Sequence, residues 1–252
     1  MRLGISKVRG LLLTAILWLC VAPSQATIAL VQHANKDVGS GTSTTLAYGS
    51  NPTANNLLIG VFRGGGATAL PYTITDTIGN TWTGLTSNQV GGIGSLQIWW
   101  AVNTTTSADT VTFAISGTAT SLRLAIYEYS GAATTSPVDA ENNSQTNGSG
   151  NPASTSITPA FNNELIIGVA STGATTTATA GTNYTQEDAV PAAANTRLSV
   201  EDWVQTTSTA TTAPQTITGG VSWMAAIAAF KPAGASSPTC SGSIALTGVG
   251  CK

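Results

Sequence analysis

Short apolar runs alternate with polar turn segments along most of the chain, from Thr27 to Lys231. Runs of this length, rich in Val, Ile, Thr and aromatic residues and bounded by Gly, Asn or Asp, are typical of β-strands. No run has the convincing period of an amphipathic helix. The clearest predicted strands are residues 28–32, 57–63, 72–76, 96–103, 110–115, 122–129, 164–170, 198–205, 215–218 and 223–231. The pattern therefore predicts an all-β protein.

One sequence pattern occurs twice in the chain. Asn-Asn-Leu-Leu-Ile-Gly-Val at 55–61 returns as Asn-Asn-Glu-Leu-Ile-Ile-Gly-Val at 162–169. Trp82 lies 14 residues before Leu96, and Tyr184 lies 14 residues before Leu198. Similarity at a fixed spacing indicates a duplicated unit, here pseudo-repeats at about residues 28–131 and 155–232. A bias toward Thr, Ala and Gly is the alternative explanation of the similarity.

The number of strands bears on the architecture. More than eight strands in two similar halves predict two packed sheets. We expect a two-sheet β-sandwich of jelly-roll or lectin-like type in one domain, residues 27–233, with strands from both halves. The alternative is two domains joined by a linker near residues 131–160, where the polar stretch 142–156 lies. Residues 234–252 form a tail rich in Gly, Ser and Pro.

The order of five motifs resembles a group of secreted bacterial β-sandwich proteins about 200 residues long. The motifs are the segment 55–61 given above, Thr-Asp-x-x-Gly-Asn-Thr-Trp at 75–82, Ile-Tyr-Glu-Tyr-Ser-Gly at 126–131, Asn-Glu-Leu-Ile-Ile-Gly at 163–168 and Ala-Ala-Phe-Lys at 228–231. The resemblance covers about residues 28–232. It implies a lectin-like or jelly-roll sandwich and carries no catalytic residues.

Residues 1–26 form a predicted signal peptide. Arg2, Lys7 and Arg9 supply a positive start, residues 11–19 an apolar stretch, and Ser24-Gln25-Ala26 a cleavage site. The apolar stretch is shorter than the roughly 20 residues that span a bilayer. We expect Sec-dependent export, a secreted or cell-surface location, and no membrane insertion.

Cleavage leaves two cysteines, Cys240 and Cys251, both in the tail. An even number of cysteines in an oxidising compartment predicts a disulfide. The residues between them are small and flexible enough to close the loop.

Removal of the signal leaves 6 of the 9 basic residues against 11 acidic ones, a net charge of about −5. Nucleic-acid partners require clustered Lys and Arg, so this balance disfavours them. It also disfavours binding to anionic lipid.

Asp76 and Asn80 flank a glycine-containing turn and offer two oxygens to a calcium ion. Calcium takes about 6 to 8 oxygen ligands, whereas Asp and Asn in such turns more often bond to their own backbone. We therefore expect turn chemistry, with calcium as a weak alternative and no other cofactor.

Carboxylates are the main catalytic candidates. Strand alternation puts Leu122, Leu124, Ile126 and Glu128 on one face of strand 122–129, and Arg123, Ala125, Tyr127 and Tyr129 on the other. If the first face is core, Glu128 lies at its rim. Glycoside hydrolysis requires two facing carboxyl groups about 5 to 9.5 Å apart, and spacing nominates no partner. Glu187-Asp188 and Glu201-Asp202 are adjacent pairs whose side chains point to opposite faces of a strand. We expect Glu128 to be solvated or paired with a basic residue.

Nucleophilic catalysis has weaker support in the sequence. His33 is the only histidine, and the chain lacks a Gly-x-Ser-x-Gly motif. A Ser-His-Asp site would have to use His33 as its base.

Two tryptophans are the better candidates for binding. In strand 96–103 the apolar positions point to the core, which places Trp99 on the opposite, polar face, and Trp203 is placed similarly in strand 198–205. An outward indole ring among amide and carboxylate groups suits stacking on a sugar. The alternative is that loops cover both rings. The predicted ligand-binding residues are Gln97, Trp99, Asn103, Glu201, Trp203 and Gln205.

These features favour an exported, non-catalytic β-sandwich that binds glycans or a cell-surface polymer. A structural or adhesive extracellular protein, capable of self-association and without a small ligand, is the second hypothesis. A glycan-cleaving enzyme is the third.

Overall fold

A computed structural model describes residues 25–66, 72–90, 93–146 and 150–235. It contains fifteen strands and one short 3-10 helix, η1 (Ala193–Asn195). The all-β prediction is confirmed. The predicted signal peptide, except for its last two residues, and the two tail cysteines lie outside the described residues. Within the described ranges, no helix is long and apolar enough to cross a membrane.

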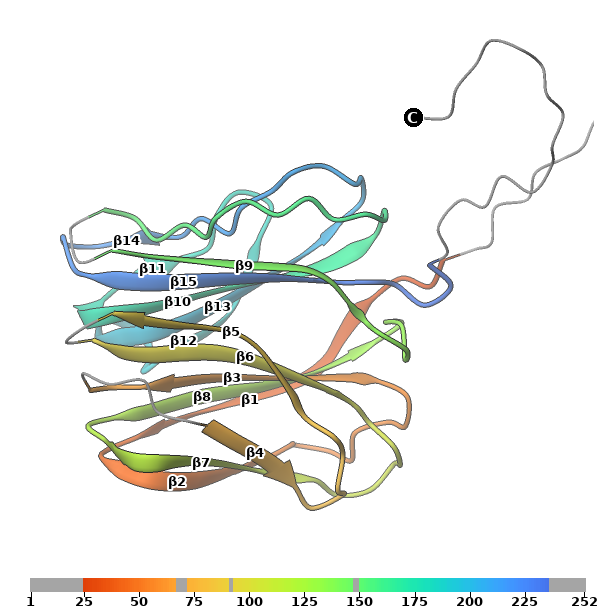
Figure 1. Cartoon of the computed structure of the whole chain (residues 1–252), viewed down its shortest axis with the longest axis horizontal. Helices are drawn as coiled ribbons and strands as arrows, with labels where there is room; N and C mark the ends of the chain where they lie inside the picture. The colour runs from red at the N-terminus through yellow and green to blue at the C-terminus, as the bar shows by residue number, and fades with distance from the viewer. Residues whose placement is uncertain (1–24, 67–71, 91–92, 147–149, 236–252) are drawn as a thin grey trace, which may run out of the picture.

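The strands form four sheets (Figure 1). The first inner sheet has the order β1-β8-β3-β6-β5, and the second inner sheet has the order β12-β13-β10-β15-β9. A cover sheet consists of β2-β7-β4, and a cover pair of β11-β14. The bounds are β1 Ala29–Val38, β2 Gly41–Ala47, β3 Leu57–Gly64, β4 Tyr72–Asp76, β5 Thr83–Val90, β6 Gly94–Val102, β7 Thr110–Ala119, β8 Leu122–Ser130, β9 Val138–Thr146, β10 Glu164–Thr176, β11 Ala178–Thr179, β12 Thr185–Val190, β13 Thr196–Gln205, β14 Thr216–Ile217 and β15 Trp223–Phe230.

The sheets stack in layers, which Figure 1 shows from bottom to top as cover sheet, first inner sheet, second inner sheet and cover pair. The largest hydrophobic cluster lies between the inner sheets and includes Ile59 and Tyr127 from the first and Val169 and Phe230 from the second. Residues from both halves of the chain therefore share one core. The protein has more layers than the two that the sequence predicted.

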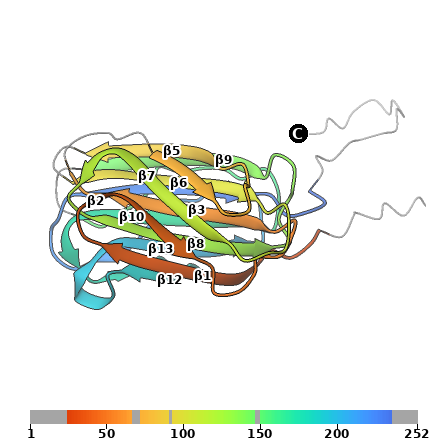
Figure 2. The ribbon, with the colours of Figure 1, turned by 90° about the horizontal axis from the view of Figure 1, so that it is seen from below.

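Two further clusters fill the outer spaces. Figure 2, seen from below, shows the cover sheet lying over the first inner sheet. Phe113 of the cover sheet packs there with Phe62 of β3. On the other side of the molecule, Ile166 and Ile227 of the second inner sheet pack with Ala213 from the segment before β14.

This arrangement buries the central strands on both faces. All eight residues of β3 are buried, as are the first eight of β8. Strand alternation still divides β8 as predicted, with Leu124 and Ile126 facing the cover sheet and Ala125 and Tyr127 facing the second inner sheet. Both faces of these strands are core, because the cover sheet lies over the face that turns away from the second inner sheet.

Four of the longer strands, β2, β5, β9 and β12, were not among the clearest predicted ones. β9 runs into the polar stretch 142–156, which was the candidate linker. It is an edge strand of the second inner sheet, paired to β15 alone. An edge strand can carry polar residues and needs no apolar run, so the sequence pattern did not reveal it.

The two inner sheets share one strand order. In each inner sheet, the first strand of that half of the chain (β1 or β9) is at one edge and pairs with the last strand of the half (β8 or β15). The remaining strands then follow in matching order, β3-β6-β5 in the first sheet and β10-β13-β12 in the second. Asn55 and Asn163 precede the matching strands β3 and β10, and both have positive φ, 68° and 60°. Gly168 of β10 requires its small size, because a Cβ there would lie 2.5 Å from Cβ of Ala213.

Candidate functional site

The two predicted platform tryptophans lie on different outer faces of the stack. Trp99 of β6 packs against the cluster beneath the cover sheet, and Trp203 of β13 packs on the cluster formed by Ile166, Ile227 and Ala213 on the other side of the molecule. Tyr184 contacts the Trp203 ring edge-on, with centroids 5.6 Å apart. Both tryptophans are half-buried. The structure does not bring them together into one binding surface.

The polar residues predicted beside them are largely enclosed. Asn103 is 1% exposed, and its Nδ2 donates to the backbone oxygens of Pro52 and Thr105. Gln205 is also 1% exposed. Gln97 is half-buried, and its Nε2 donates to the Leu85 oxygen at 3.0 Å. The expectation that these side chains line an open polar face is wrong, because the outer layers cover that face.

Glu201 is the most deeply placed of the predicted ligand-binding residues. It is 0% exposed and lies on β13 directly opposite Gly168 of the neighbouring strand β10, with Oε1 against the glycine. Oε2 accepts a hydrogen bond from the Gly181 N–H at 2.8 Å, while Oε1 has no hydrogen-bond partner among the described residues. Burial raises the pKa of Glu201 to about 7.

The Asp76 turn is built from its own hydrogen bonds. Oδ1 accepts from the backbone N–H groups of Gly79 and Asn80, at 2.6 and 2.9 Å. Oδ2 accepts from Asn80 Nδ2 and Trp82 Nε1, both at 2.8 Å. Asn80 Oδ1 accepts in turn from Thr104. Both carboxylate oxygens are thus used within the fold, and the described residues contain no group of three or more His, Cys, Asp and Glu side chains suited to a metal ion.

The sequence suggested that Glu128 is solvated or paired with a basic residue, and among the described residues the structure shows neither. Glu128 is 0% exposed. Its carboxylate accepts hydrogen bonds from Gln32 Nε2 at 2.6 Å, the Thr53 N–H at 2.7 Å and Asn56 Nδ2 at 2.6 Å. These bonds tie β8 to β1 and to the loop before β3, which is a structural role.

His33 lies in a polar cluster where β1 faces β12. Its Nδ1 is 3.1 Å from Asp188 Oδ2, with side chains 38% and 3% exposed. Asp188 also accepts from Asn35 Nδ2 and from the Tyr127 hydroxyl, both at 2.5 Å. Asp188 thereby links the first inner sheet to the second.

A pair of carboxyl groups lies beside this cluster. They are Glu187 and Asp202, and Asp202 Oδ2 accepts a hydrogen bond from the Tyr129 hydroxyl at 2.9 Å. Burial, reinforced by the charge of Asp202, raises the pKa of Glu187 to about 7.

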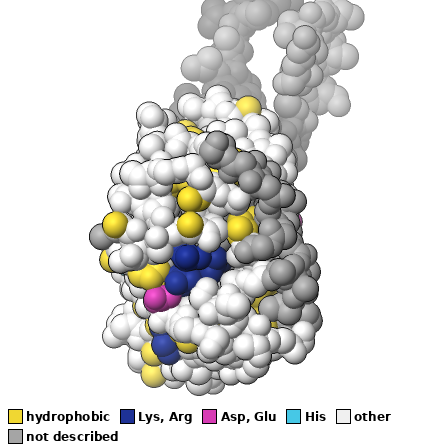
Figure 3. Space-filling view, turned by 90° about the vertical axis from the view of Figure 1, so that its left-hand side faces the viewer, with side chains coloured by type: hydrophobic (Ala, Val, Ile, Leu, Met, Phe, Trp, Pro, Cys, Tyr) yellow, Lys and Arg dark blue, Asp and Glu magenta, His cyan; other side chains and the backbone are white. Residues whose placement is uncertain are grey.

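All three arginines of the described residues lie at one end of the stack, where β3 ends and β8 and β13 begin. We call Arg63, Arg123 and Arg197 the arginine end. Figure 3 looks onto this end of the molecule and shows Lys and Arg side chains gathered near its centre, next to an acidic side chain. Register places Arg63 directly opposite Arg123 in the first inner sheet. Like charges in that position destabilise a sheet.

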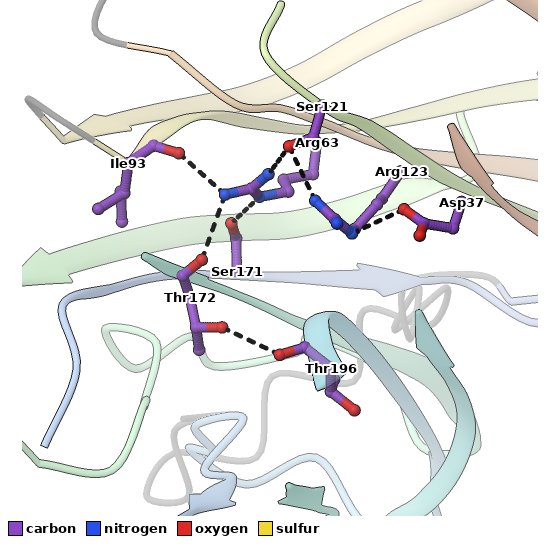
Figure 4. Close-up of polar contacts among 8 residues, drawn as sticks. All are labelled: Asp37, Arg63, Ile93, Ser121, Arg123, Ser171, Thr172 and Thr196. Carbon is purple, nitrogen blue, oxygen red and sulfur yellow. Dashed lines mark hydrogen bonds and ion pairs between the residues drawn. The ribbon is translucent and has the colours of Figure 1, made fainter. Parts of the chain in front are cut away.

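Arg63 lies between the inner sheets and is 1% exposed (Figure 4). It donates to Ser171 Oγ at 3.1 Å, Ser121 Oγ at 2.7 Å, and the backbone oxygens of Ile93 at 3.1 Å and Thr172 at 3.2 Å. Because Ser171 and Thr172 belong to β10, these bonds connect the two inner sheets.

The charge of Arg63 is stabilised by uncharged hydrogen-bond acceptors, two serine hydroxyl groups and two backbone oxygens. Within the described ranges it makes no ion pair with a carboxylate. Burial, followed by the charges of Arg123 and Arg197, lowers its pKa to about 9. A buried cation without a carboxylate is costly, so its presence beside two further arginines calls for an explanation.

Arg123 is held less completely. It is 9% exposed, and Nη1 donates to Ser121 Oγ at 2.8 Å. Nε lies 3.0 Å from Asp37 Oδ1, but without hydrogen-bond geometry, so this buried N–H has no hydrogen-bond partner in the described part of the chain. Arg197 is half-buried and donates through Nη1 to the Gly173 oxygen at 2.9 Å.

The sequence predictions missed the arginine end. A signal was present, since each of the three arginines lies at or next to the end of a predicted strand. Which strand ends meet depends on sheet order, which the spacing of the motifs does not give.

The chain matches no protein-family model, no curated protein and no solved structure. What it does must therefore be inferred from its own geometry.

Proposed function

We propose that this protein is an exported, non-catalytic β-sandwich module that binds an extracellular glycan or a cell-surface polymer at the arginine end. The observation that carries the proposal is the convergence of all three arginines of the described residues at one end of the stacked sheets. A chain with few basic residues gains nothing in stability from gathering them there, because the charges repel.

The position of the arginine end supports this function. β-Sandwiches commonly bind ligands at the ends where strands and loops meet. The described chain begins and ends at the opposite end, where the Ala26 N–H donates to the Ala233 oxygen at 3.2 Å (Figure 1). The arginine end therefore points away from both ends of the described chain.

The use of the carboxylates supports a non-catalytic role. Asp76, Glu128 and Asp188 each accept several hydrogen bonds that hold neighbouring segments together. A general acid or base needs an oxygen that can reach substrate.

The test is retention of the mature protein on a panel of immobilised neutral and acidic polysaccharides. At least one polymer should retain the wild type and Lys231→Gln but release Arg197→Gln. Lys231 is the matched control because it follows β15 at the end opposite the arginines. The proposal would be refuted if no polymer retained the wild type, or if Arg197→Gln bound as well as Lys231→Gln.

We also propose that each half derives from one jelly-roll unit by duplication. In the first half, the inner sheet contains β1-β8-β3-β6 and the cover sheet contains β2-β7-β4. The chain therefore passes back and forth between two layers, as it does in a jelly roll. The common strand order of the inner sheets and the matching positive-φ asparagines support the duplication.

A further inference from the structure

We infer that the arginine end takes an acidic group of its polymer, a carboxylate or a sulfate ester, at Arg123 and Arg197, and that Asp37 competes with this group for Arg123. The inference rests on the proposed function and specifies the ligand class as an acidic glycan.

The unpartnered N–H of Arg123 is the first argument. A guanidinium has five donors in a planar fork that matches the oxygens of a carboxylate or a sulfate. Arg123 is 9% exposed, yet its buried Nε lacks a hydrogen-bond partner among the described residues. Buried donors are nearly always satisfied. Asp37 pairs with this guanidinium by charge without satisfying the N–H, whereas an acidic group that lies in line with the N–H would satisfy it.

Repulsion between the arginines is the second argument. Arg63 lies directly opposite Arg123, and Arg197 precedes Leu198, which pairs with Ser171, a hydrogen-bond partner of Arg63. Four hydrogen bonds hold Arg63 in place, so it acts as a fixed positive charge behind the other two. An anion bound in front of them would relieve the repulsion.

The asymmetry of the Asp37–Arg123 pair is the third argument. Asp37 stands opposite Arg123 on the edge strand β1, and its side chain is 42% exposed against 11% for Arg123 (Figure 4). An ion pair whose carboxylate is solvent-exposed is weakened by water and by salt. A ligand group can therefore displace Asp37 at small cost while Arg123 stays in place.

The net charge makes the inference specific to this end. The mature chain carries about −5, which repels polyanions from the molecule as a whole. Binding of an acidic polymer would need a local cationic site, and it should weaken as salt screens the charges.

The test is calorimetric titration of the full mature protein with polygalacturonate, dextran sulfate and unsubstituted dextran. Asp37→Asn should bind an acidic polymer about 2- to 5-fold more tightly than the wild type, because it removes the competing carboxylate. Arg123→Gln should bind that polymer about tenfold more weakly or worse, and Lys231→Gln should match the wild type. Asp37→Asn keeps the test independent of whether Arg123→Gln folds.

Binding of polygalacturonate alone would identify a carboxylate as the recognised group, and binding of dextran sulfate alone would identify a sulfate; either supports the inference. Unchanged or weaker acidic binding by Asp37→Asn overturns it. Preference for dextran that is lost in Arg197→Gln also overturns it, while leaving the proposed function standing. Absence of any bound polymer, including on the wider panel above, would remove both.

Discussion

Replacing Glu201 by Gln should stabilise the protein at alkaline pH and change little at acidic pH. Glu201 is 0% exposed, and only one of its carboxylate oxygens has a hydrogen-bond donor in the described part of the chain, the N–H of Gly181 at 2.8 Å. Burial raises the pKa of this carboxyl from 4.5 to about 7. Gln retains the shape and an acceptor for Gly181, and it carries no charge at any pH.

The magnitude follows from the difference between the pKa of Glu201 in the folded protein and in the unfolded chain. The folded protein binds this proton more tightly than the unfolded chain does, so the free energy of unfolding falls as pH rises from about 4.5 to about 7. A tenfold change in proton affinity corresponds to about 1.4 kcal/mol, so ionisation of Glu201 removes about 3 kcal/mol by pH 8. Relative to the wild type, Glu201→Gln should therefore gain about 3 kcal/mol between about pH 4 and pH 8.

Urea unfolding of both proteins at intervals of one pH unit measures this difference. Burial also raises the pKa of Glu164 and Glu187 to about 7, but both residues are present in both proteins and cancel in the comparison. Glu141→Gln, at an exposed glutamate on β9, controls for the loss of one carboxyl group. A difference between Glu201→Gln and the wild type that stays constant across this range would refute the reasoning.

Three further predictions concern packing, the turn and the tail. Trp99→Ala and Trp100→Ala should both lower the free energy of unfolding by about 2 to 4 kcal/mol. Trp99 packs beneath the cover sheet, and Trp100 packs against the core between the inner sheets. An unchanged free energy of unfolding for Trp99→Ala in urea would contradict this prediction. Asp76→Ala should cost about 2 to 4 kcal/mol because four hydrogen bonds are lost, and a wild-type melting temperature raised by calcium would instead favour a metal site. Cys240→Ser should barely move the melting temperature, because the roughly 2 to 3 kcal/mol of loop entropy acts on a predicted tail outside the sandwich. Thiol titration of the wild type should detect no free thiol at Cys240 or Cys251.

Local pattern predicted much of the fold. The β4 segment was placed at its observed bounds, and alternation in β8 assigned Leu124 and Tyr127 to opposite faces correctly. The Asp76 turn also formed as expected, because its partners lie within six residues along the chain. Polar edge strands such as β9 escaped prediction because their stability comes from a neighbouring strand.

The candidate site could not be predicted in the same way. Alternation correctly placed Trp99 opposite Trp100, but it does not say what covers each face, and the cover sheet turned the expected open surface into packing. Arg63 and Arg123 became neighbours only through the pairing of β3 with β8. Their distance to Ser171 depends on how one inner sheet lies on the other.

The sequence by itself therefore determined the all-β class, the side of each strand on which a residue lies, and the turns closed by nearby side chains. These depend on backbone propensity and on contacts over a few residues. Only the tertiary structure decided that both faces of the central strands are buried, that Glu201 lies in the interior, and that three distant arginines meet at one end. Burial and charge proximity arise from contacts between segments far apart in the chain, and the free energy of those contacts is absent from any local pattern.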